Sequence, residues 1–107
     1  MTVIEFSEKL GLKKLSGGAD RGINSCYISD LLSRVLNGCQ SGDVWITVQN
    51  SVNMVAVAMM TDAACVILPE GLTASVDVID RANDEGLIIF SSEESAFSLA
   101  VKVAQLL

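Results

Sequence analysis

The segment from Asp43 to Met60 constrains the fold more than any other part of the chain. It begins with a continuous run of β-branched and aromatic residues, Val44 to Val48, which is typical of a strand that is buried on both faces of a sheet. A polar turn follows, and Ser51 then stands at the expected N-cap of a helix rich in alanine and methionine. Strand, turn and helix make one βα unit, and open parallel sheets bind ligands at the carboxyl ends of their strands.

Capping and turn residues divide the rest of the chain into short helices and strands. We expect helices capped by Thr2, Ser29, Thr73 and Ser91, and further strands at 14–15, 24–28, 64–68 and 87–90. The inward positions of the last two helices are predicted to be Val76, Ile79 and Ala82, and then Phe97, Ala100, Val101 and Ala104. Apolar strands that alternate with helices predict one domain spanning residues 1–107, with the fold of a three-layer α/β/α sandwich around a mostly parallel sheet.

The chain is unusually apolar for its length. Half of its 107 residues are hydrophobic, although a small domain has a large surface relative to its interior. The expected central helix has one polar residue, Asn53, between Val52 and Met60, so all of its sides need cover. A homodimer would supply that cover. The alternative is cover by the first and last helices of the same chain.

The charge pattern excludes several classes of partner. The net charge is −6, and no basic cluster is larger than Lys13-Lys14, so we expect no nucleic acid and no anionic membrane surface as a partner. No apolar run approaches the roughly 20 residues that span a bilayer, and residues 1–10 do not resemble a signal peptide. The three cysteines show no CxxC spacing. These features are typical of a cytoplasmic protein.

Catalytic and metal-binding patterns are missing from the sequence. There is no histidine, no P-loop motif and no G-x-G-x-x-G motif, so we predict no catalytic residue, no metal and no cofactor. Cys39 and Cys65 stand in apolar surroundings, and Cys26 is the one cysteine that invites a test of modification. An enzyme that uses Asp30 or Glu70 as its acid or base remains an alternative.

Polar residues follow the predicted strands and are candidate ligand contacts. The amino ends of helices carry unpaired amide groups and a positive dipole, and both favour a bound anion. The loop 16–22 could add the guanidinium of Arg21 as a countercharge. The candidate ligand-binding residues are therefore Arg21, Ser29, Gln49, Asn50, Ser51, Asn53 and Ser91. Alternatively, the polar residues only cap helices, and Arg21 pairs with Asp20.

Three segments of the chain resemble the DRTGG-type domain, and in particular the branch that forms the amino-terminal domain of HPr kinase/phosphorylase. They are YISDLLS at 27–33, GDVWITVQ at 42–49 and VNMVAVA at 52–58, and the resemblance continues at 86–89 and 95–97. The resemblance implies an α/β/α fold and a regulatory or sensory role, since such domains accompany CBS modules and metabolic enzymes. Similar stand-alone proteins are associated with gene clusters of the iron-hydrogenase and NADH-dehydrogenase type. Kinase activity is not implied, because it belongs to a P-loop domain.

These observations lead to one hypothesis and one alternative. The hypothesis is a homodimeric, non-catalytic regulatory domain that binds a small anionic metabolite or nucleotide at the carboxyl ends of its strands. The alternative is an adaptor without a ligand, which docks its apolar central helix or its acidic surface onto a metabolic or redox partner protein.

Overall fold

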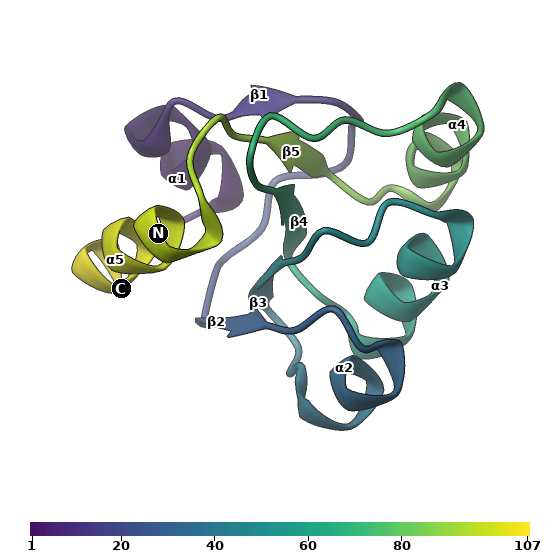
Figure 1. Cartoon of the computed structure of the whole chain (residues 1–107), viewed down its shortest axis with the longest axis horizontal. Helices are drawn as coiled ribbons and strands as arrows, with labels where there is room; N and C mark the ends of the chain where they lie inside the picture. Colours follow the sequence, from purple (N-terminus) through teal and green to yellow (C-terminus); the bar gives the residue numbers. More distant parts are fainter.

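A five-stranded sheet forms the middle layer of the computed structural model, which describes residues 1–107 (Figure 1). The strands are β1 (Lys13–Lys14), β2 (Ser25–Ile28), β3 (Asp43–Ile46), β4 (Cys65–Leu68) and β5 (Ile89–Ser91). Their order in the sheet is β1-β5-β4-β3-β2, with β2 to β5 parallel and β1 antiparallel to β5. The predicted α/β/α sandwich with a mostly parallel sheet is confirmed.

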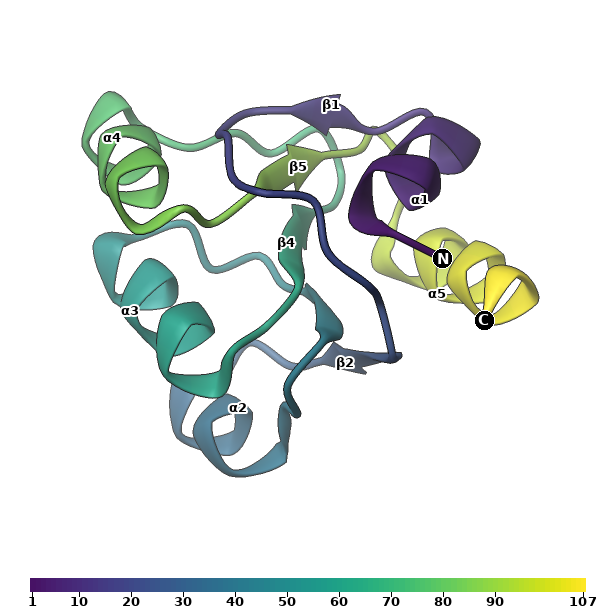
Figure 2. The same cartoon turned by 180° about the vertical axis from the view of Figure 1, so that it is seen from behind.

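Helices cover both faces of this sheet. They are α1 (Val3–Leu10), α2 (Leu32–Gly38), α3 (Val52–Thr61), α4 (Val76–Glu85) and α5 (Ala96–Leu106). Helices α2, α3 and α4 lie on one face with α3 in the middle, and α1 and α5 lie together on the other (Figures 1 and 2). The three crossovers between β2 and β5 therefore all run over the same face.

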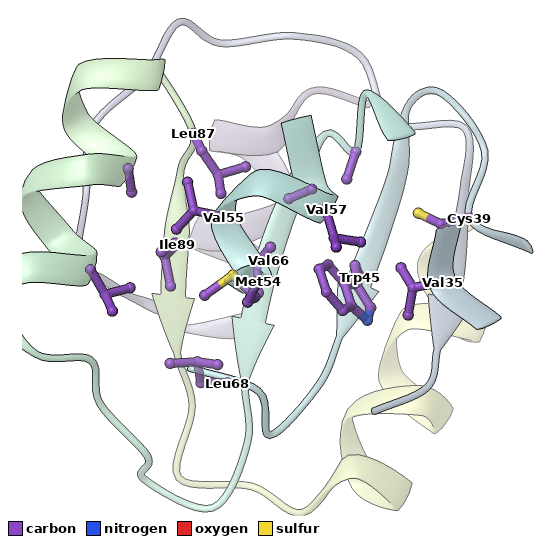
Figure 3. Close-up of a cluster of buried hydrophobic side chains, with 14 residues drawn as sticks. Val35, Cys39, Trp45, Met54, Val55, Val57, Val66, Leu68, Leu87 and Ile89 are labelled. Carbon is purple, nitrogen blue, oxygen red and sulfur yellow. The ribbon is translucent and has the colours of Figure 1, made fainter. Parts of the chain in front are cut away.

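Two hydrophobic cores fill the spaces between the three layers. All residues of β3 and β4 are buried, and successive side chains point to opposite faces. Trp45 and Val66 point into the core beneath α2, α3 and α4 (Figure 3). Ile46 and Ile67 pack on the other side, beneath α1 and α5. A strand with two buried faces is what the continuous apolar run at Asp43 predicts.

Three helices begin later than the sequence pattern predicts. Helix α1 does begin at the capping box of Thr2, as expected. Helix α4, however, is capped by Ser75 and not by Thr73, and α5 is capped by Ser95 and not by Ser91, which is the last residue of β5. Helix α2 begins at Leu32, after Ser29 has accepted a hydrogen bond from the amide of Leu31. These extra residues carry the chain from the edge of the sheet out to the helix layer.

The inward faces of α4 and α5 differ from the prediction. On α4 the predicted inward residue Ala82 is buried and Ile79 is half-buried, but Val76 is 71% exposed and Val78 is buried instead. On α5 the expected inward residue Phe97 is 79% exposed, while Leu99 and Val103 are buried. Helix α5 is apolar on most of its circumference, so its periodicity could not determine which side faces the sheet.

The central helix α3 is covered by its neighbours on one face of the sheet. Its buried residues are Met54, Val55, Val57 and Ala58. The neighbours are α2 and α4, and not the first and last helices, which lie on the opposite face. The outer side of α3 is open to solvent, where Met59 is 40% and Met60 is 74% exposed.

Candidate functional site

The carboxyl ends of β2, β3, β4 and β5 lie along one edge of the sheet because the four strands are parallel. We call the segments that leave them the carboxyl rim; these are residues 29–31, 47–53, 69–75 and 91–95. The rim contains six of the seven predicted ligand-binding residues. They are Ser29, Gln49, Asn50, Ser51, Asn53 and Ser91.

Hydrogen bonds join the β2 and β3 ends of the rim. The Asp30 Oδ1 atom accepts from the hydroxyl of Thr47 at 2.8 Å and from the amide of Val48 at 2.9 Å. The side-chain amide of Gln49 donates to the carbonyl of Asp30 at 2.8 Å. Sequence reasoning missed Thr47, which it placed inside the strand. The single hydroxyl within the run Val44 to Val48 was the signal that could have identified it.

A second set of hydrogen bonds continues the rim to β5. The side-chain amide of Asn50 donates to the carbonyl of Thr73 at 3.0 Å. The Ser91 hydroxyl donates to the carbonyl of Leu72 at 2.6 Å. The amide donors of Gln49 and Asn50 therefore hold neighbouring loops, and their side-chain oxygens accept no hydrogen bond from the chain.

The amino end of α3 differs from those of the other long helices. The side chains of Thr2, Ser75 and Ser95 each accept a hydrogen bond from an amide in the first turn of their helices. Ser51 occupies the same position before α3, but its side chain makes no capping bond. The amides of Val52 and Asn53 are therefore free, whereas the amide of Met54 donates to the Ser51 carbonyl at 3.0 Å. The helix dipole makes this end of the helix favourable for an anion. Asn53 lies exposed in the same turn.

Arg21 does not belong to the carboxyl rim, and the expectation that it would supply a countercharge there was wrong. Its guanidinium binds the carboxylate of Asp62 with two hydrogen bonds of 2.7 and 3.1 Å. Asp62 ends α3, and its carbonyl accepts from the amide of Gly42 just before β3, so the pair lies at the amino ends of the strands. Asp20 does not pair with Arg21 through their side chains, because its carboxylate accepts from the amide of Ile4 at the start of α1.

Hydrogen bonds at this opposite edge shift the pKa values of Asp62 and Arg21. The guanidinium of Arg21 and the hydroxyl of Ser41 both donate to Asp62 and lower the pKa of its carboxyl from 3.8 to about 2. The same carboxylate raises the pKa of Arg21. The ion pair therefore fastens the loop 16–22 to the end of α3.

The carboxyl rim is acidic. Asp30, Glu70, Glu93 and Glu94 all lie on it, and the nearby Lys102 is paired with Glu94 at 2.7 Å. An anion at the rim would therefore be held by amide groups and not by a basic side chain. The structure brings together no three His, Cys, Asp or Glu side chains that could hold a metal ion.

The cysteines lie away from the rim and are poor nucleophiles. Burial raises the pKa of the Cys26 thiol to about 11, and it raises the pKa of Cys39 and Cys65 as well. The thiolate is the reactive form, so all three react slowly near neutral pH. Cys26 also borders a hollow of about 280 Å³ between β2 and α5, which is not part of the carboxyl rim.

Comparison with known proteins gives a match at the level of fold. No family model matches the chain, and no curated protein matches it. The crystal structure of the CBS and DRTGG domains of the regulatory region of Clostridium perfringens pyrophosphatase, complexed with the activator diadenosine tetraphosphate, superposes with a TM-score of 0.75 at 12% sequence identity. The match covers 98% of this chain and 46% of that one, so this chain spans about half of the solved protein. The superposition supports the DRTGG-type fold that the sequence resemblance implies. No helix of the structure is both long and apolar enough to cross a membrane.

Proposed function

We propose that this chain is a non-catalytic regulatory domain that binds a small anionic metabolite or a nucleotide at the carboxyl rim. The observation that carries the proposal is the amino end of α3, where the amides of Val52 and Asn53 are unpaired, although a serine or threonine caps each of the other long helices. Free amides at the start of a helix bind phosphate and carboxylate groups. The free side-chain oxygens of Gln49 and Asn50 lie just before these amides and can accept hydrogen bonds from a base or a sugar.

The solved structure that shares this fold makes a nucleotide the first class of ligand to test. It is a regulatory region, and it was crystallised with the activator diadenosine tetraphosphate. A polyphosphate at the acidic rim of this chain would lie close to Asp30 and Glu70. A divalent cation bound to the phosphates would reduce that repulsion, so we expect binding to be tighter with Mg²⁺.

A thermal-shift screen of mononucleotides, diadenosine polyphosphates and phosphorylated metabolites, each with and without Mg²⁺, tests the proposal. A ligand at one hundred times its dissociation constant adds about 2.7 kcal/mol to the free energy of unfolding, which raises the melting temperature by roughly 10 °C for a domain of this size. No shift with any compound would contradict the proposal.

The variant Asn53→Asp tests the location of the site. It places a negative charge in the first turn of α3, which stabilises the free helix but repels a bound anion. We expect the melting temperature of the free protein to rise slightly, while the ligand-induced shift falls by more than half. The matched control is Gln105→Glu, which makes the same amide-to-carboxylate change on an exposed position of α5. Equal ligand-induced shifts in both variants would place the ligand elsewhere.

The adaptor hypothesis keeps one observation in its favour. The outer side of α3 carries three exposed apolar side chains, Val52, Met59 and Met60. Flexible methionine side chains adapt well to the surface of a partner protein. A protein that shows no thermal shift with any compound, and that binds a metabolic or redox enzyme only while Met60 is intact, would favour this second function.

A further inference from the structure

The two edges of the sheet are protected very differently. Strand β1 has two residues, and both are exposed lysines. Strand β2 has four residues, Ser25 to Ile28, and none is charged. Soluble proteins protect sheet edges with short strands, lysine or proline, because an open edge pairs with other strands. The β2 edge carries no such protection.

The direction of the free backbone groups on β2 follows from its pairing with β3. The amide of Asn24 donates to the carbonyl of Gly42 at 2.9 Å, just before the two strands begin. In a parallel ladder alternate residues face the neighbouring strand, so Cys26 and Ile28 also turn their amide and carbonyl groups toward β3. Ser25 and Tyr27 turn theirs outward, away from the sheet.

Helix α5 presents an apolar stripe beside this edge. The stripe consists of Phe97, Ala100, Val101, Ala104 and Leu107. It runs from the residues that border the hollow beside Val103 out to the exposed Phe97 and Val101. Three of them are well exposed, namely Phe97 at 79%, Val101 at 43% and Leu107 at 49%. The 280 Å³ hollow lies between this stripe and β2, and six of its seven lining residues are hydrophobic.

We propose that a second copy of this chain occupies the β2 edge and the α5 stripe, with β2 antiparallel to the partner's β2 around a two-fold axis at Tyr27. Residues opposite each other in antiparallel strands point their side chains to the same face of the sheet. The backbone amides and carbonyls that point outward from one β2 must also lie opposite those that point outward from the other, so that hydrogen bonds can form between them. Both conditions hold when Tyr27 exchanges two hydrogen bonds with the partner's Tyr27. Cys26 then stands opposite the partner's Ile28 on the α5 face, where that side chain covers the hollow. The same axis places α5 beside the partner's α5.

The charge pattern allows a second copy at this face. Each chain carries a net charge of −6, so two copies repel each other unless the contact excludes carboxylates. Strand β2 has no charged residue, and the single charged residue of α5, Lys102, is paired with Glu94. Two copies can therefore meet here without burying an acidic group.

A stable interface covers about 800 Å² on each partner, which is roughly one seventh of the 5349 Å² surface of this chain, so one side of the molecule can supply it.

Sedimentation equilibrium of the full chain and of two variants tests the interface. The 11.3 kDa chain should sediment as a dimer. Phe97→Glu places a charge on an exposed position of the stripe and should raise the dissociation constant at least 100-fold while the monomer stays folded. Met60→Glu, at an equally exposed apolar position on α3, is the matched control and should leave the dimer intact. A monomeric wild type, or a dimer that Met60→Glu dissociates and Phe97→Glu does not, would overturn the proposal.

Cysteine cross-linking tests the register. Opposite residues of a non-hydrogen-bonded antiparallel pair lie about 4.5 Å apart at Cα, within the range that a disulfide spans. Ile28→Cys should therefore form a covalent dimer with Cys26 on mild oxidation, and Cys26→Ser in the same background should abolish it. The wild type carries Cys26 but no cysteine at position 28. If it forms the covalent dimer as readily as Ile28→Cys does, the axis lies at Cys26 and the proposed register is wrong.

Discussion

The hydrogen bonds that Asp30 accepts offer a quantitative test of how the carboxyl rim is held together. Its Oδ1 atom accepts from the Thr47 hydroxyl and the Val48 amide at 2.8 and 2.9 Å. Hydrogen bonds to charged groups contribute about 1.5–3 kcal/mol when buried, and we take about 1 kcal/mol each because Asp30 is exposed. Asp30→Ala should then lower the free energy of unfolding by about 2 kcal/mol, or roughly 8 °C in melting temperature for a domain of this length.

The variant Asp30→Asn separates the hydrogen bonds from the charge. The side-chain oxygen of the asparagine can occupy the position of Oδ1 and accept both bonds. Asp30→Asn should therefore lose at most half of the free energy of unfolding that Asp30→Ala loses. Urea unfolding of both variants, together with Thr47→Val and the double variant Asp30→Ala/Thr47→Val, measures the coupling between the two side chains. We expect a coupling free energy of about 1 kcal/mol. An asparagine variant as unstable as the alanine variant, or a coupling below about 0.3 kcal/mol, would refute the assignment of these bonds.

Three further predictions concern the glycine loop, the central helix and acid stability. Gly18→Ala should cost about 1–3 kcal/mol because its new methyl group would clash with a backbone carbonyl after α4, whereas Gly17→Ala, with its nearest neighbour at 3.9 Å, should cost far less in the same urea titration. Met54→Ala should cost about 2–5 kcal/mol because Met54 is fully buried, and Met60→Ala, at 74% exposure, should stay within about 0.5 kcal/mol. The pKa of Asp62 is lower in the folded state, so its contribution to stability is present above pH 3.8 and is lost as the pH falls toward about 2. The wild type should therefore lose more stability than Asp62→Asn across that interval. Acid titrations in which the two proteins lose stability in parallel would contradict the ion pair.

The sequence determined much of the architecture because burial on two faces leaves a strong local pattern. The continuous apolar run after Asp43 predicted a strand enclosed by helices, and all residues of β3 are buried. The capping box at Thr2 predicted the start of α1 for a similar reason, since both of its hydrogen bonds form within four residues. The polar residues that gather at the carboxyl rim were predictable because parallel strands share the edge at which they end.

Tertiary structure decided what the local pattern left open. Helix α5 is apolar on nearly every side, so only its packing on the sheet determined that Leu99 is buried and Phe97 is exposed. The position of Arg21 depended on residues distant in the chain, because its guanidinium pairs with Asp62, 41 residues away, and its carbonyl accepts from the amide of Val3. The sequence by itself thus determined the strands, the central helix and the shared rim, since short-range burial and capping specify them. Contacts between residues distant in the chain decided which helix face is exposed and which edge carries the guanidinium, because each depends on a surface that exists only after folding.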